Sequence, residues 1–190
     1  TMVALRSFAQ FVSDIHPELP NITAALNCTP AKRRRVYVGY SDEDAQKILA
    51  VIDRESIKGK RDFAMVMLAY STGLRSCDIL NLKFENIDWR THEIRLIQEK
   101  TNVPLALPLD AATGNAIAEY ILNGRPECDS EYVFIRTQHP YTRMLSFWQI
   151  VAEYARRALG TSRKMNGPHA FRRGMGRRLL EAGVPSPMIC

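Results

Sequence analysis

The chain has 190 residues and a formal net charge of +6, with 46% hydrophobic and 24% charged residues and an isoelectric point of about 9.3. This is an ordinary globular composition, long enough for one or two folded domains, and it excludes a disordered polymer. The basic excess favours an anionic partner. No apolar run approaches the ~20 residues that cross a bilayer, and the amino terminus lacks the charged-then-apolar order of a signal peptide.

The amino-terminal part is predicted to be one amphipathic helix followed by a linker. Apolar residues recur at helical spacing from Val3 to Ile15. The segment after this helix contains three prolines, which is typical of a linker. It ends in a run of four basic residues, which are candidate DNA contacts: Lys32, Arg33, Arg34 and Arg35. We therefore expect the chain to divide into residues 1–35 and 36–190.

The second part is predicted to begin with two helices, a short helix and a hairpin. Ser41, followed three residues later by Asp44, has the pattern of a capping box. A buried helix is expected from Lys60 to Thr72, with Gly73 as its stop, and a short helix through "SCDILNL" follows. The segments "EIRLIQEK" and "VPLALPL" flank a "TN" turn and predict a β-hairpin from about Glu93 to Leu109.

The remaining elements are predicted to be helical, apart from a short strand at "YVFI". Asp110 is the expected N-cap of the helix "DAATGNAIAEYILN". Further helices are expected from about Thr142 to Leu159 and from Pro168 to Gly183. The first of these carries four apolar residues on one face: Leu145, Trp148, Val151 and Ala155. The predicted fold is mainly α with a small antiparallel β-sheet or hairpin.

The four cysteines and four histidines are dispersed along the chain. No CxxC pair occurs, which argues against a zinc site, and the length argues against a disulfide scaffold. We interpret the cysteines as reduced thiols and expect a cytoplasmic protein. These residues are Cys28, Cys77, Cys128, Cys190, His16, His92, His139 and His169.

Three short motifs carry side chains that suit phosphate chemistry. In "TGLRSCD", Arg75 follows a Gly-Leu helix stop and can present its planar fork of donors to a phosphate, and Asp78 could orient it from the same helical face. In "PHAFRR", His169 and Arg172 are three residues apart and share a helix face. Lys100 is expected at the hairpin tip, where its flexible side chain could reach a ligand.

Each motif has an ordinary structural explanation when taken alone. Arg75 and Asp78 could form a surface ion pair, Lys100 could be solvated, and the last helix could be a basic amphipathic helix with an incidental histidine. From Arg156 to Arg178 there are eight Lys or Arg residues and no acidic residue. Such a stretch is expected either in a surface that binds nucleic acid or in a surface that is exposed only to solvent.

Together and in this order, the three motifs resemble the catalytic domain of the tyrosine recombinases, also called the phage integrase family. The resemblance covers Ser41 to Cys190. "TGLRSCDILNLKFENIDW" is similar to the segment of the family's first arginine, "EKTNVPLALPL" to its lysine hairpin, and "PHAFRRGMGRRLLEAGV" to its His-x-x-Arg helix. Residues 1–35 would then be the last helix of a preceding DNA-clamping domain with a basic linker.

The resemblance implies a site-specific recombinase that cuts and rejoins double-stranded DNA through a 3′-phosphotyrosyl intermediate. Arg75 and Arg172 would neutralise the negative charge that develops on the phosphate in the transition state. Lys100 would be the general acid, and His169 would hydrogen-bond the phosphate. Asp78 would orient the guanidinium group of Arg75. Arg173 and Arg177 would contact DNA. No metal, cofactor, membrane or small-molecule substrate is implied, and the partners would be DNA and further protomers, as a tetramer for the full-length protein.

One element of the family's site is missing from the sequence. The nucleophilic tyrosine is expected a few dozen residues after the His-x-x-Arg motif, whereas all seven tyrosines precede His169. We therefore expect a fragment that binds phosphate and does not cleave by itself. The alternative is a non-catalytic DNA-binding accessory protein derived from a recombinase fold. A structural helical protein would leave the ordered motifs unexplained.

Overall fold

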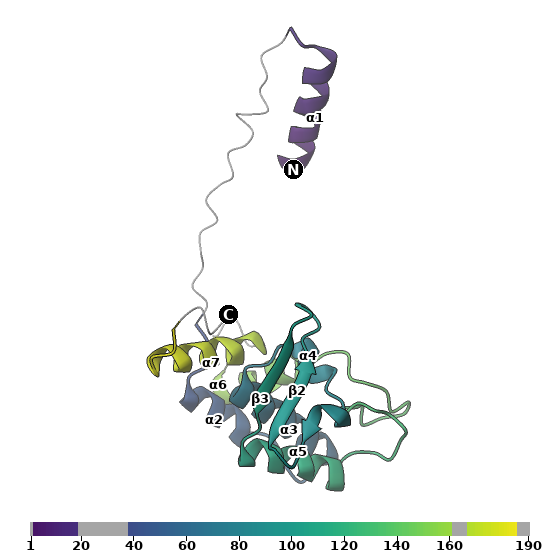
Figure 1. Ribbon diagram of the computed structural model, residues 1–190, viewed down its shortest axis with the longest axis vertical. Coiled ribbons are helices and arrows are strands. Elements are labelled where there is room, and N and C mark those ends of the chain that lie inside the picture. Colours follow the sequence, from purple (N-terminus) through teal and green to yellow (C-terminus); the bar gives the residue numbers. More distant parts are fainter. Residues whose placement is uncertain (1, 19–37, 161–166, 186–190) are drawn as a thin grey trace. The chain divides into compact units, whose positions relative to one another are not determined.

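The computed structural model describes residues 2–18, 38–160 and 167–185. The chain divides into two units, Thr1–Val36 and Tyr37–Cys190 (Figure 1). In the first unit, helix α1 (Met2–Ile15) matches the predicted amphipathic helix. Leu5, Phe8, Phe11 and Ile15 are each more than half exposed on it. The assignment of this helix to a DNA-clamping domain remains a prediction.

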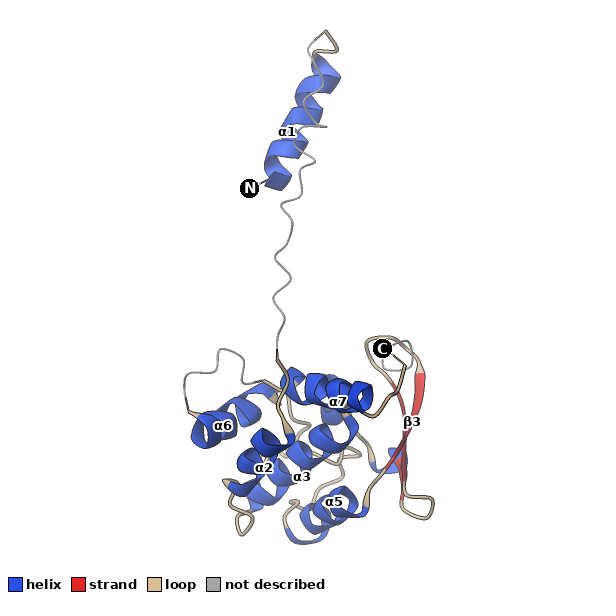
Figure 2. Cartoon of the chain, turned by 90° about the vertical axis from the view of Figure 1, so that its left-hand side faces the viewer, coloured by secondary structure: helices blue, strands red, loops and turns tan. Residues whose placement is uncertain are grey.

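The second unit is built around helix α3 (Ile57–Thr72), with α2 (Asp42–Ala50), α5 (Ala111–Asn123) and α7 (His169–Glu181) around it (Figure 2). Two predicted caps are confirmed because they depend only on local geometry. The Ser41 side chain accepts from the Asp44 backbone while the Asp44 carboxylate accepts from Ser41 N, and the Asp110 side chain accepts from Thr113 N.

The sheet has three antiparallel strands in the order β1-β2-β3. Strands β2 (Glu93–Ile97) and β3 (Pro104–Pro108) form the predicted hairpin, in which Arg95 lies opposite Ala106. The sequence analysis did not predict strand β1 (Ile87–Asp88), which pairs with β2 after the 3-10 helix Phe84–Asn86. The fold is therefore mainly helical with a small antiparallel sheet, as expected.

Two predicted elements differ from the structure between Tyr132 and Trp148. The expected strand "YVFI" is wrong, because Tyr132 and Ile135 form only isolated bridges, with Lys83 and Arg143. The bridge between Ile135 and Arg143, and the hydrogen bond from Arg136 N to Thr142 O, use backbone groups on both sides of Pro140. A backbone engaged in this way cannot also be helical, so the segment from Thr142 onward is not yet a helix.

Helix α6 (Trp148–Leu159) consequently begins six residues later than predicted. Val151 and Ala155 are buried as expected, whereas Trp148 is 59% exposed and Leu145, which precedes the helix, is 80% exposed. The four apolar residues predicted to share one helix face therefore do not all lie in the helix, because Leu145 precedes its first residue. Among the described helices, none is long and apolar enough to cross a membrane.

Candidate active site

The first part of the site is the corner between α3 and the short helix α4 (Ser76–Leu80). Gly73 ends α3 in the left-handed conformation, with φ of 64°, and donates its N–H to Ala69 O. A side chain would be strained there, which explains the glycine. Leu74 is buried and anchors the turn, and Arg75 follows as the N-cap of α4.

Arg75 is half-buried, and its Nη1 atom is buried without a hydrogen-bond partner among the described residues. An unsatisfied buried donor costs roughly 1–3 kcal/mol, and more for a charged group. Such a cost is tolerated where the group meets a ligand, which makes Arg75 a candidate anion contact.

Helix α7 brings the second motif to this corner. Arg172 Nη1 donates a hydrogen bond of 3.0 Å to the carbonyl oxygen of Gly73, two residues before Arg75. A side chain at Gly73 would also place its Cβ 3.1 Å from Met175, so α7 and the α3–α4 turn are in close contact. The structure thus brings Arg172 to the turn that carries Arg75, although the two motifs are far apart in sequence.

His169 and Arg172 line one open cavity of about 290 Å³. His169, the first residue of α7, is exposed, and Arg172 is half-buried. Arg173 is half-buried and lines the same cavity. The complete lining is Thr72, Gly73, His169, Arg172, Arg173, Met175, Gly176 and Leu179.

The glycine at position 174 of α7 permits close backbone packing. A Cβ at Gly174 would lie 2.3 Å from Tyr40 O, and a Cβ at Gly39 would lie 2.3 Å from Gly174 N. Tyr40 N also donates to Ala170 O at 3.0 Å. The segment before α2 therefore packs directly against the backbone of α7. This contact fixes the position of the helix that carries His169 and Arg172.

Asp78 is buried at 3% exposure and contacts the hairpin. Its Oδ1 atom accepts a hydrogen bond of 3.1 Å from Glu99 N, and its Oδ2 atom is buried without a hydrogen-bond partner among the described residues. Within the described part of the chain, no ion pair joins Asp78 to Arg75. Its expected role in orienting Arg75 remains a prediction.

Lys100 lies in the turn between β2 and β3 and is exposed. The turn is closed by a hydrogen bond from Asn102 N to Gln98 O at 2.8 Å, with Asn102 in the left-handed conformation. Lys100 does not line the cavity of His169 and Arg172. The structure thus gathers Arg172 and His169 beside the turn of Arg75, while Lys100 stands on the hairpin, one residue after the Glu99–Asp78 contact.

Sequence reasoning missed a set of side chains that braces this hairpin. Asn81 Nδ2 donates to Glu99 Oε2, and Arg143 Nη1 donates to Asn81 Oδ1. Asn81, Glu99 and Arg143 also line a cavity of about 670 Å³ with Asp78. They come from three separate segments, so no spacing in the sequence marks them as neighbours.

The candidate DNA contacts differ in what the structure records. Arg177 is exposed on α7 and forms an ion pair of 2.7 Å with Glu181, a solvated pair that contributes little to stability. The predicted contacts Lys32, Arg33, Arg34 and Arg35 lie outside the described residues.

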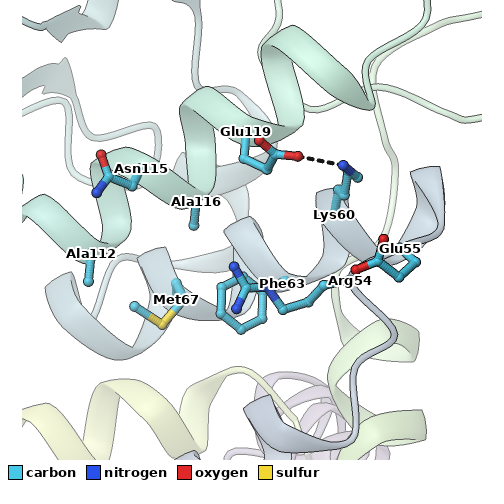
Figure 3. A pocket seen from close by; sticks show the side chains of 9 residues that line it. All are labelled: Arg54, Glu55, Lys60, Phe63, Met67, Ala112, Asn115, Ala116 and Glu119. Atoms are coloured by element: carbon cyan, nitrogen blue, oxygen red, sulfur yellow. Dashed lines mark hydrogen bonds and ion pairs between the residues drawn. The ribbon is translucent and has the colours of Figure 1, made fainter.

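A third cavity, of about 640 Å³, lies between α3 and α5 and contains none of the predicted site residues (Figure 3). Its wall includes the Lys60–Glu119 ion pair and Arg54, whose guanidinium carbon lies 4.4 Å from the ring centre of Phe63. Among the described residues, no group of three or more His, Cys, Asp or Glu could hold a metal ion.

Comparison with known proteins assigns the chain to a family. Residues 40–190 match the model of the phage integrase family. A Sinorhizobium fredii protein named as an integrase/recombinase, y4gC, is 36% identical over 148 residues, which are 78% of this chain and 77% of that protein. The tyrosine recombinase XerA of Pyrococcus furiosus is 29% identical over 152 residues, 78% of this chain and only 50% of that protein.

Solved structures share the fold at lower sequence identity. A crystal structure of the XerA recombinase matches all of this chain and 72% of its own, with a TM-score of 0.66 at 18% identity. A lambda integrase dimer bound to a core site matches 99% of this chain and 68% of its own, with a TM-score of 0.61 at 20% identity. The fold is that of the tyrosine recombinase catalytic domains. The chain belongs to the phage integrase family.

Proposed function

We propose that this chain is the catalytic region of a site-specific DNA recombinase, which cuts and rejoins DNA through a 3′-phosphotyrosyl intermediate. The observation that carries the proposal is the hydrogen bond from Arg172 Nη1 to Gly73 O. It brings one arginine to the turn that presents the other, so both guanidinium groups can serve one phosphate.

In this proposal, Arg75 and Arg172 stabilise the charge that develops on the non-bridging oxygens of the scissile phosphate. Guanidinium groups suit this role because their donors match two phosphate oxygens at once and stay charged. The unpartnered buried Nη1 of Arg75 supports the assignment. Two fixed cations also supply charge that a metal ion supplies in other phosphoryl-transfer sites, so the reaction needs no metal or nucleotide cofactor.

Lys100 and His169 are assigned the proton transfers. Lys100 donates a proton to the leaving 5′ oxygen, and His169 hydrogen-bonds the phosphate and assists at the nucleophile. The exposed hairpin turn allows Lys100 to approach bound DNA, while the Asp78–Glu99 contact limits how far the turn can move. His169 lies on the same cavity as Arg172, which supports its contact with the same phosphate.

The nucleophilic tyrosine is proposed to come from outside residues 1–190. Tyr40, Tyr120 and Tyr154 are buried. The Tyr70 hydroxyl donates to Asp42. No tyrosine follows His169 in the sequence. A longer product of the same gene, acting in the same or in a neighbouring protomer, would then supply the attacking hydroxyl, and residues 1–190 alone would bind DNA without cleaving it.

The proposed partners are double-stranded DNA and further protomers on that DNA, as a tetramer, in the cytoplasm. The lambda integrase structure, a dimer bound to a core site, supports the part of this proposal in which more than one protomer binds DNA. Arg173 and Arg177 on α7, and the basic run from Lys32 to Arg35, are the proposed contacts to the phosphate backbone, which carry affinity and no sequence information.

The test combines DNA selection with detection of a covalent adduct. Duplexes that bind residues 1–190 are enriched from a random library at ~150 mM salt, where non-specific binding is weakened. The full-length gene product is then incubated with the enriched duplex, and adducts that survive denaturation in detergent are measured. Arg75→Ala and Arg172→Ala are each expected to reduce adduct formation by about a hundredfold or more.

Arg157→Ala is the matched control, because Arg157 is an exposed arginine on α6 whose recorded partners are Glu153 and the Tyr154 ring. It should leave adduct formation unchanged. A full-length product that binds the enriched duplex, retains a downstream tyrosine and forms no adduct would refute the recombinase proposal. It would support the non-catalytic accessory protein instead.

A further inference from the structure

Arg178, near the carboxyl end of α7, joins that helix to two others. Its Nη1 atom donates to Asp42 Oδ1 at 2.6 Å, at the start of α2, and its Nη2 atom donates to Tyr70 O at 2.5 Å, in the last turn of α3. Its guanidinium carbon also lies 4.2 Å from the ring centre of Tyr70. The Tyr70 hydroxyl completes the cluster by donating to the same Asp42 oxygen at 3.0 Å.

These contacts require the planar fork of an arginine. Two nitrogens of one rigid group reach two acceptors on different helices, while the flat face covers an aromatic ring. A lysine has one charged nitrogen without a flat face, so it can keep the charge and cannot keep this geometry. The Arg178 side chain is only 26% exposed, so the cluster is partly shielded from solvent.

The cluster is linked to the site through the side chain of Met175. Arg178 Nη2 lies 3.3 Å from the Met175 sulfur. Met175 packs on Gly73, whose carbonyl oxygen accepts the hydrogen bond from Arg172. A rotation of α7 about its axis would therefore disturb the Arg178 contacts and the Arg172–Gly73 contact together.

We propose that Arg178 is a positioning residue, which fixes the rotation of α7 so that Arg172 stays beside the turn of Arg75. This inference rests on the proposed function for its catalytic consequence. Arg178 itself touches neither DNA nor the reacting atoms in this role. It acts through Asp42, Tyr70 and Met175, and Asp42 acts with it from outside α7.

The experiment compares Arg178→Lys, Arg178→Met and Asp42→Ala with the wild type. The Nε–Hε resonance of Arg172 and the carbonyl ¹³C resonance of Gly73 are recorded in the free protein, and affinity for an enriched duplex is measured separately. Both resonances are expected to shift in all three variants. Duplex affinity should fall roughly tenfold in Arg178→Lys, although the charge is retained.

Arg157→Lys and Arg157→Met are the matched controls, because Arg157 also pairs with a carboxylate and lies 5.8 Å from a tyrosine ring without any recorded contact to α7. Both should leave the two resonances unchanged, and Arg157→Lys, which keeps the charge, should also leave the duplex affinity unchanged. If Arg178→Lys or Asp42→Ala folds and keeps the wild-type resonances, the positioning role is refuted.

The two proposals fail in different ways. If the wild type binds no duplex in an Arg172-dependent manner, the proposed function fails, and the resonances of the free protein still decide whether Arg178 positions Arg172. If Arg178→Met does not fold, Asp42→Ala tests the same link from the carboxylate side, where the side chain is 60% exposed.

Discussion

Asp78 holds the β2–β3 hairpin by accepting a hydrogen bond from the backbone nitrogen of Glu99 at 3.1 Å. The contact joins the short helix that follows Arg75 to the residue that precedes Lys100. Two of the proposed catalytic side chains are therefore connected through one buried carboxylate, although no direct contact between them is recorded in the described residues.

Replacing Asp78 with alanine should loosen the hairpin locally. The Glu99 amide loses its acceptor, so its hydrogen exchange should accelerate by about tenfold. Asp78→Asn keeps an acceptor oxygen and should retain most of the protection. Asp129→Ala, at an exposed loop position, is the control. Unchanged exchange at Glu99 in Asp78→Ala would show that the hydrogen bond does not restrain the turn.

Gly174→Ala should destabilise the second unit. The added Cβ would lie 2.3 Å from Tyr40 O, a backbone atom that cannot move without shifting the segment before α2. Overpacking of this kind costs roughly 1–3 kcal/mol, which urea denaturation would measure.

Gly114→Ala is the matched control, because Gly114 is also buried in a helix but its Cβ would lie 3.6 Å from Leu109. That change should stabilise the helix by about 0.5–1 kcal/mol. Equal effects of the two substitutions would contradict the close approach of Tyr40 to α7.

The Asp42–Arg178 contact should depend on pH. The hydrogen bond from Arg178 is the main cause that lowers the pKa of Asp42 below its usual value. A carboxyl group with a lowered pKa in the folded state stabilises it above the unfolded pKa of about 3.9, and this contribution is lost as the pH falls through the folded pKa. The melting temperature of the wild type should therefore exceed that of Asp42→Asn at pH 7.

That difference should begin to shrink as the pH falls below about 4, the pKa of the unfolded state, and should be lost as the pH falls through the lowered pKa of Asp42 in the folded state. Melting curves of both proteins between pH 3 and pH 7 would measure it. The effect will be modest because the Asp42 side chain is largely exposed and screened by solvent. A difference that persists unchanged at pH 3 would mean that the charge of Asp42 is not its cause.

Tyr154→Phe should destabilise the core at a single polar cluster. Asp62 is fully buried, pairs with Arg61, and accepts from the Tyr154 hydroxyl at 3.1 Å. Burial raises the pKa of Asp62, and the Arg61 guanidinium opposes that rise. Loss of the hydroxyl leaves Asp62 Oδ2 unsatisfied and should cost about 1–3 kcal/mol.

Urea denaturation of Tyr154→Phe would measure this loss, with Tyr141→Phe as the control at an exposed tyrosine. The control should stay within about 0.5 kcal/mol of the wild type. A loss of equal size in both variants would show that the Tyr154–Asp62 hydrogen bond contributes nothing specific.

The sequence predicted elements well where their signals are local. The capping box at Ser41, the N-cap at Asp110 and the helix stop at Gly73 each depend on residues within about one helical turn. It was wrong between Tyr132 and Trp148, where isolated bridges to distant residues replace a strand and delay a helix. Such pairings between distant residues produce no periodic pattern of apolar residues in the sequence.

By itself, the sequence determined the fold class, the three motifs and the resemblance to the family. Helix ends, turns and charged motifs each depend on residues that lie close together in the sequence. Only the tertiary structure decided that Arg172 reaches Gly73, that Asp78 bonds to Glu99, and that Arg178 joins Asp42 and Tyr70. Each of these contacts joins different elements. Its partners become neighbours only when burial of the apolar core has set the helices and the hairpin against one another.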